Sequence, residues 1–140
     1  MTLKNRATAD WGLLILRVGM GLGLFALHGW GKVKGAWGHF VSGEEWGFAA
    51  GVAGIGFPFP RFFALLSTLA ESVGALLVAA GLWTRIAAGI VSFNMAVAVY
   101  RHLTTDMRFE LAAMYLLVAL SLCLLGPGRL SIDNLHSRRR

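Results

Sequence analysis

Four apolar runs, each long enough or nearly long enough to cross a lipid bilayer, dominate this sequence of 140 residues. They cover residues 11–30, 62–82, 86–103 and 109–125, and a membrane-spanning helix needs about 20 predominantly apolar residues. With 56% hydrophobic and only 14% charged residues, the chain is too apolar for an ordinary soluble domain, which carries about 25% charged residues. The sequence therefore predicts an all-α integral membrane protein, a four-helix bundle in contact with the lipid bilayer.

The segments outside these runs complete one expected transmembrane domain, residues 1–140. The connection 31–61 holds several Trp and Phe residues and a Gly-rich apolar stretch, so it is too apolar for a solvated loop. We expect an interfacial segment there, with a short helix over about residues 43–52. Two interpretations stay open for it: a belt of aromatic anchors, or a lid over the outer mouth of the bundle.

Lysine and arginine residues predict the orientation, because they are enriched in the cytoplasmic connections of membrane proteins. The two ends of the chain and the turn after residue 82 hold slightly more of them than the other connections do. We therefore expect both termini in the cytoplasm, with residues 126–140 forming a basic cytoplasmic tail. The net charge of +6 is then largely charge at the membrane surface. Because the basic residues form no stripe, no nucleic-acid partner is expected.

One acidic residue, Glu71, stands near the middle of the second run. A carboxylate is costly there unless a cation, a proton or a water-filled cavity accompanies it. Helical phase, at about 100° per residue, places Arg17 and His28 on one stripe of the first run, and Lys32 continues that stripe if the helix extends by one turn. We expect Arg17 and Glu71 to form an ion pair. The alternative is that Arg17 reaches the inner headgroups and Glu71 is protonated.

The third run contributes Asn94 and His102 to the same predicted interior. Asn94 is expected to bond a neighbouring helix, as buried amides in membrane bundles usually do, and a backbone carbonyl is an alternative partner for His28. No catalytic residue is identified. The candidate ligand-binding residues are Arg17, His28, Lys32, Glu71, Asn94 and His102.

Thiol and metal chemistry find little support in the sequence. A single cysteine, Cys123, excludes an intrachain disulfide and any Cys-x-x-Cys site. The histidines show no paired ligand spacing, although a haem or metal held by His28 and His102 is conceivable. We therefore expect no metal site.

Several short motifs follow one another in the order of a known family. They are Leu-Arg-Val-Gly at 16–19 with Phe-Ala-Leu-His-Gly-Trp-Gly-Lys at 25–32, Gly-Phe-Pro-Phe-Pro at 56–60, Ala-Glu-Ser-Val-Gly at 70–74, Gly-Leu-Trp-Thr-Arg at 81–85, and Gly-Pro-Gly-Arg-Leu-Ser-Ile-Asp at 126–133. With these motifs the chain resembles the DoxX family. The resemblance implies a four-helix, multi-pass protein of the bacterial inner membrane.

The resemblance also suggests functional positions and a setting. Family positions fall on Arg17, His28, Gly29, Lys32, Glu71, Arg85 and Asp133. Arg85 and Asp133 look structural: Asp133, with Ser131, is expected to cap a short C-terminal helix or to bond Arg85. The family takes its name from similarity to the membrane subunit of a thiosulfate:quinone oxidoreductase, and some relatives are associated with membrane redox complexes.

These observations favour a subunit of a membrane redox complex, with a site for a quinone or another small molecule inside the helix bundle. The chain has no intrinsic cofactor in this hypothesis, so a partner protein delivers electrons, and both catalysis and homodimerisation stay open. A second hypothesis is a non-catalytic membrane scaffold or partner subunit whose polar cluster is structural. A small proton-coupled transporter ranks last, because four spans are few for a carrier.

Overall fold

A computed structural model describes residues 3–137, and within this range the chain is helical without a strand. Three helices are long and apolar enough to cross a membrane: Ala7–Ser42, Pro60–Ala80 and Thr84–Thr105. A shorter apolar helix, α7 (Glu110–Leu125), has 16 residues and is about 24 Å long. The chain is therefore an all-α membrane protein, as predicted.

The first spanning helix extends well beyond residue 30, where we expected it to end. It consists of α1 (Leu3–Leu24), a π-helical turn η1 (Phe25–Gly29) and α2 (Trp30–Ser42). No proline interrupts the hydrogen-bond ladder, and the helix ends only where Gly43 takes a left-handed conformation with φ of 70°. The 36 residues from Ala7 to Ser42 span about 54 Å, more than the roughly 30 Å of hydrocarbon, so part of this helix lies outside the hydrocarbon layer or the helix is strongly tilted.

Most of the expected interfacial segment is helical. After α2 the chain forms α3 (Gly47–Gly54), which begins a few residues later than predicted. This short helix packs on α4 and α2 through a small apolar core of its own. The buried residues of this core are Ala36, Trp46, Ala49, Val52 and Ala64.

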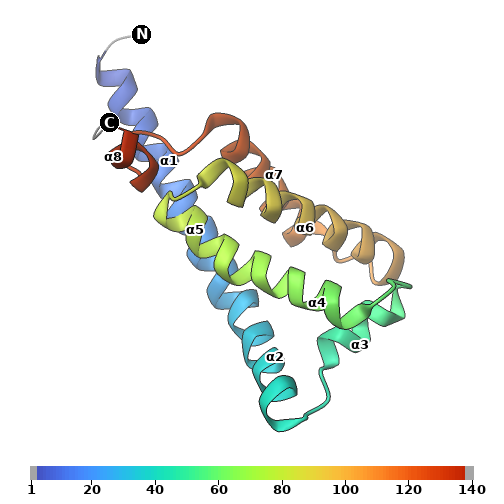
Figure 1. Cartoon of the computed structure of the whole chain (residues 1–140). Helices are drawn as coiled ribbons and strands as arrows, with labels where there is room; N and C mark the ends of the chain where they lie inside the picture. Colours follow the sequence, from blue (N-terminus) through green and yellow to red (C-terminus); the bar gives the residue numbers. More distant parts are fainter. Residues whose placement is uncertain (1–2, 138–140) are drawn as a thin grey trace.

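The second spanning helix lies at the centre of the molecule. It consists of α4 (Pro60–Leu69), a second π-helical turn η2 (Ala70–Gly74) and α5 (Ala75–Ala80). A tight turn leads into α6 (Thr84–Thr105), which forms an antiparallel hairpin with α7 (Figure 1). The main core joins α1, α5, α6 and α7, and its most deeply buried members include Leu24, Ala75, Val78, Ala88, Val91, Ala119 and Leu122.

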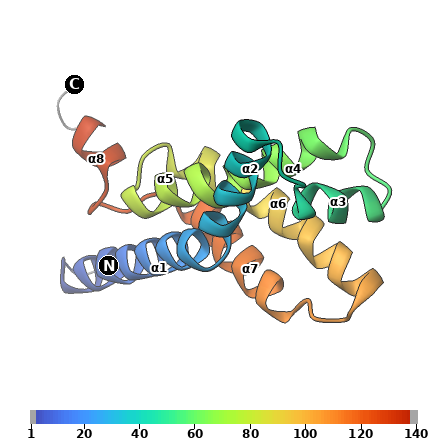
Figure 2. The same ribbon diagram turned by 90° about the horizontal axis from the view of Figure 1, so that it is seen from below.

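The two ends of the molecule differ in their elements. The first turns of α1, the α5–α6 turn and the short helix α8 (Ile132–Ser137) gather at one end, which we call the terminal end (Figure 1). The opposite, distal end carries α3 and the α6–α7 turn. In both views α2 lies on the side of α4 and away from α7 (Figures 1 and 2). The expected orientation across the membrane rests partly on Arg138, Arg139 and Arg140, which lie outside the described residues, and stays a prediction.

Candidate functional site

The carboxylate of Glu71 is the centre of a buried polar cluster near the middle of the second spanning helix. Glu71 is only 3% exposed. Its Oε1 atom accepts hydrogen bonds from Lys32 Nζ at 2.5 Å and from Asn94 Nδ2 at 2.8 Å. Ser67 Oγ lies 3.5 Å from the same oxygen and 3.3 Å from Lys32 Nζ. Side chains from α2, α4 and α6 thus converge on one carboxylate.

Two π-helical turns bring the first and second helices together at this depth. The turn η1 packs against η2, and a Cβ on the buried Gly29 would run into the backbone carbonyl of Glu71. Only glycine allows this approach. Such turns shift the register of a helix and occur frequently at functional sites; here one of them carries Glu71 and the other carries His28.

Two ring side chains, those of His28 and Tyr115, lie next to the cluster. The rings of His28 and Tyr115 meet edge-on, with their centroids 5.9 Å apart, and Tyr115 lies within electrostatic range of Glu71. Neither side chain has a hydrogen-bond partner in the described part of the chain. Both are half-buried, as are Lys32 and Asn94, so the cluster has an accessible side.

A third aromatic ring covers Lys32 from the distal end. The ammonium of Lys32 lies 4.0 Å from the centre of the Phe48 ring, a cation–π contact. Phe48 belongs to α3, so this helix contributes directly to the surroundings of the cluster.

The expected ion pair between Arg17 and Glu71 is wrong. Arg17 donates to the backbone carbonyls of Ala79 at 3.2 Å, Pro127 at 2.5 Å and Leu130 at 2.6 Å. Ala79 lies eight residues after Glu71, which is about 12 Å along the helix. Helical phase correctly placed Arg17 on the stripe of the first helix that faces the bundle interior. The first helix is, however, displaced along its axis relative to the second, compared with the position that we expected. Lys32 rather than Arg17 therefore lies beside Glu71.

His102 also lies away from the cluster. Its Nδ1 atom is 2.8 Å from Oδ1 of Asp106 at the distal end of α6, eight residues and about 12 Å beyond Asn94. The hydrogen bond with His102 and the backbone N–H of Arg108 hold the pKa of Asp106 below its ordinary value. In the described residues, no three His, Cys, Asp or Glu side chains form a group that could hold a metal ion.

Asp133 and Arg85 are found at the terminal end of the molecule. Asp133 does not cap its own helix: Ser131 does so, by accepting from the N–H of Asn134 at 3.2 Å. The Asp133 carboxylate instead accepts from the N–H groups of Trp83 and Thr84, at 2.7 and 2.9 Å, and from the Thr84 hydroxyl. Arg85 packs against Gly126 and has no hydrogen bond to Asp133 in the described chain.

Burial and hydrogen bonding act in opposite directions on Asp133. Burial alone would raise the pKa of its carboxyl, but the hydrogen bonds from Thr84 and Trp83 outweigh this effect. The pKa therefore lies below its ordinary value, because the N-terminus of α6 stabilises the ionised form.

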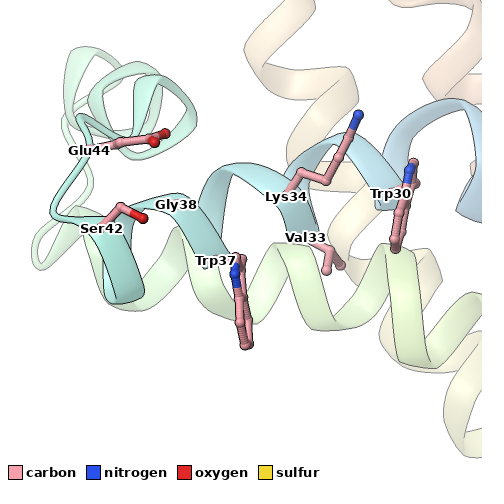
Figure 3. Close-up of a pocket in the computed structure, with 7 residues that line it drawn as sticks. All are labelled: Trp30, Val33, Lys34, Trp37, Gly38, Ser42 and Glu44. Atoms are coloured by element: carbon pink, nitrogen blue, oxygen red, sulfur yellow. The ribbon is translucent and has the colours of Figure 1, made fainter.

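Two cavities open elsewhere on the molecule. One, of about 510 Å³, lies along α2 at the distal end (Figure 3). The other, of about 270 Å³, is an apolar groove between α1 and α7, where Tyr115 contributes to its wall. The second cavity therefore adjoins the candidate site through Tyr115.

Sequence reasoning found most of this site and missed part of it. Lys32, Glu71 and Asn94 meet, and His28 lies beside them with Tyr115. Tyr115 and Phe48 were not identified. Tyr115 could have been identified from the sequence, because it places a polar hydroxyl within the fourth apolar run. Phe48 could not, because nothing distinguishes it from the other aromatic residues of the segment 31–61.

Comparison with known proteins identifies a family. The family model DoxX matches residues 12–104, a range that includes Lys32, Glu71 and Asn94 but not Tyr115 or Asp133. No curated protein and no solved structure matches the chain.

Proposed function

Because the chain belongs to the DoxX family of membrane proteins, we propose that it is a subunit of a membrane redox complex that binds a quinone ring beside the Lys32–Glu71–Asn94 cluster. The observation that carries this proposal is a carboxylate at mid-helix, held by an ammonium and an amide, next to two ring side chains that have no hydrogen-bond partner in the described residues.

The cluster has the chemistry that a quinone carbonyl requires. A carbonyl oxygen accepts hydrogen bonds, and the imidazole of His28, the hydroxyl of Tyr115 and the amide of Asn94 are potential donors. All three side chains are half-buried. A flat ring that approaches from the accessible side would meet these donors without displacing Lys32 from Glu71.

The cluster also has groups that exchange protons. Reduction of a quinone to a quinol takes up two electrons and two protons. Lys32 and Glu71 share a short hydrogen bond of 2.5 Å, and side chains of this kind relay protons inside membrane proteins. In this proposal the protons reach the ring through Glu71 and His28, while a partner subunit supplies the electrons.

The apolar groove between α1 and α7 supports access from the lipid. Its walls are apolar except for Tyr115 and consist of Ile15, Leu16, Gly19, Met20, Leu111, Met114, Tyr115 and Val118. A lipid-soluble quinone partitions into the bilayer, so a route that begins at a lipid-facing surface suits this class of ligand better than a route from water.

Equilibrium binding of ubiquinone-type and menaquinone-type analogues to the full chain in lipid nanodiscs tests the proposal. We expect saturable binding that Glu71→Gln weakens by about tenfold or more, because the carboxylate that holds Lys32 and Asn94 in place beside the ring is lost. Glu45→Gln is the matched control, because Glu45 is exposed in the loop before α3 and should bind as the wild type does.

A second variant keeps the test decisive if Glu71→Gln fails to fold. Tyr115→Phe removes one hydroxyl and leaves the Lys32–Glu71 pair intact, so it should weaken binding in a folded protein. Absence of saturable binding by the wild type, or binding unaffected by both variants, would overturn the proposal and favour a structural scaffold.

A further inference from the structure

The cavity along α2 has an exposed carboxylate, that of Glu44, on one wall, and the backbone of Glu44 is fixed by hydrogen bonds. The backbone N–H of Glu44 donates to the carbonyl of Gly38 at 3.3 Å, and the Glu44 carbonyl lies 2.8 Å from Nδ1 of His39. The Glu44 carboxylate rests on Gly38, with Oε2 only 2.6 Å from the position that a Cβ there would occupy. Any larger residue at position 38 would displace it.

This carboxylate has no cationic partner in the part of the chain that the structure describes. Among the described residues, Glu44 takes part in no salt bridge. A lysine on the same cavity, Lys34, does not reach it and has no ion-pair partner in the described chain either. The cavity therefore presents separate negative and positive groups, Glu44 and Lys34, with the hydroxyl of Ser42 also in its lining (Figure 3).

The rest of the lining is typical of a membrane interface. Trp30 and Trp37 are 51% and 70% exposed, and Phe40 and Val41 beside them are also exposed. Tryptophan is enriched at the level of lipid headgroups, where its ring is apolar and its N–H is polar. The same ring face attracts an ammonium group.

From this arrangement we infer that the cavity binds the headgroup of a phospholipid that carries a primary ammonium, of the phosphatidylethanolamine type. Lys34 binds the phosphate, and Glu44, with the hydroxyl of Ser42 beside it, binds the ammonium (Figure 3). An anionic headgroup without an ammonium is disfavoured, because Glu44 repels it. A choline headgroup is bound less well, since its nitrogen has no N–H to donate to a carboxylate.

The lipid is favoured over a soluble zwitterion because of what surrounds the cavity. Exposed aromatic and aliphatic side chains of α2 extend from it along a helix that crosses the membrane. Acyl chains fit that surface, whereas a soluble ligand gains nothing from it. This inference does not depend on quinone binding.

Lipid binding to the full chain in detergent, followed by native mass spectrometry, tests the inference on the wild-type protein. The lipids share the same acyl chains and carry ethanolamine, its N-methyl and N,N-dimethyl derivatives, choline or glycerol headgroups. We expect affinity to fall with each methyl group, and the phosphatidylglycerol to bind about tenfold more weakly than the ethanolamine lipid. Equal binding of all headgroups would mean non-specific lipid only and would overturn the inference.

Two variants and one control test whether the headgroup preference comes from the cavity residues. Glu44→Gln should abolish the preference for ethanolamine over glycerol, and Lys34→Gln should weaken binding of both lipids. Glu45→Gln removes the neighbouring charge, which lies outside the cavity lining, and should keep the wild-type preference. If Glu45→Gln changes the preference as much as Glu44→Gln does, a general surface charge explains the binding and the site is refuted.

Discussion

Glu71 and Arg17 are buried to a similar degree, 3% and 2% exposed, yet they have different kinds of partner. Glu71 is held by the side chains of Lys32 and Asn94, which are able to move and to exchange a proton or a hydrogen bond. Within residues 3–137, Arg17 donates only to backbone carbonyls, and a guanidinium with its planar set of donors suits several of them at once. Glu71 therefore belongs to a candidate site, whereas Arg17 links the first helix to α5 and to the segment after α7.

The role of Arg17 predicts a large loss of stability when it is replaced. Arg17→Met leaves three carbonyls without their charged donor and should lower the free energy of unfolding by about 3 kcal/mol. The free energy of unfolding of Arg17→Lys should lie between those of the wild type and Arg17→Met, because one ammonium group cannot match the geometry of the guanidinium. Unfolding by denaturant in mixed micelles measures both.

Arg61→Met is the matched control for Arg17→Met. Arg61 is exposed at the beginning of α4, so this variant should be nearly as stable as the wild type. Equal unfolding free energies for the position 17 and position 61 variants would contradict the structural role of Arg17.

At the level of elements, α8 depends on contacts with other parts of the chain. It has only six residues, too few to be stable as an isolated helix. The backbone N–H of Asp133 donates to the carbonyl of Gly81 at 2.9 Å, and its carboxylate caps the N-terminus of α6. The C-terminal segment therefore closes the α5–α6 turn.

This capping interaction predicts a pH-dependent stability. The folded pKa of Asp133 lies below its ordinary value, which is about 3.9 in an unfolded chain. The ionised carboxylate thus stabilises the fold above that pH, and the stabilisation is lost as the pH falls through the folded pKa. Asp133→Asn should melt at a lower temperature than the wild type at pH 7, and the difference should shrink below about pH 4.

Thermal unfolding between pH 3 and pH 7 measures this effect. Glu45→Gln, an exposed carboxyl without a capping role, should follow the wild type across the range. A difference between wild type and Asp133→Asn that does not change with pH would show that the charge of Asp133 contributes no stability.

The whole molecule has two apolar cores with the polar cluster between them. The larger core joins α1, α5, α6 and α7, and the smaller one joins α2, α3 and α4 around Trp46. Large apolar side chains are exposed on most helices, because lipid rather than water surrounds them. The fully buried positions include small residues such as Ala64, Ala75, Ala88 and Ala119, which let helices approach closely.

The separation of the cores predicts local opening at the distal end. Trp46 is 4% exposed and packs on His39, Phe40 and Phe48. Trp46→Ala should raise amide hydrogen exchange over residues 44–58 and leave residues 75–95 close to wild type, since the larger core is untouched. Trp83→Ala is the control, because Trp83 is 66% exposed at the terminal end. A uniform rise over both segments would show that the cores unfold together.

Much of the architecture was predictable because the bilayer sets the length of a span. The runs ending in residues 82 and 103 correspond closely to Pro60–Ala80 and Thr84–Thr105. The first helix was predicted too short, because the apolar run ends at residue 30, whereas the helix continues to Ser42. Lys32 turns inward to Glu71, and a lysine with such a partner is tolerated inside a span.

The sequence by itself determined the membrane-spanning class, the inward stripe that carries Arg17, His28 and Lys32, and the need of Glu71 for a partner. Only the tertiary structure decided which of those residues is the partner. Helical phase specifies the direction in which a side chain points, but not the depth at which one helix lies against the next. That depth is set by close packing, with Gly21 against Ala75 and Gly29 against Glu71, and it places Lys32 rather than Arg17 beside the carboxylate.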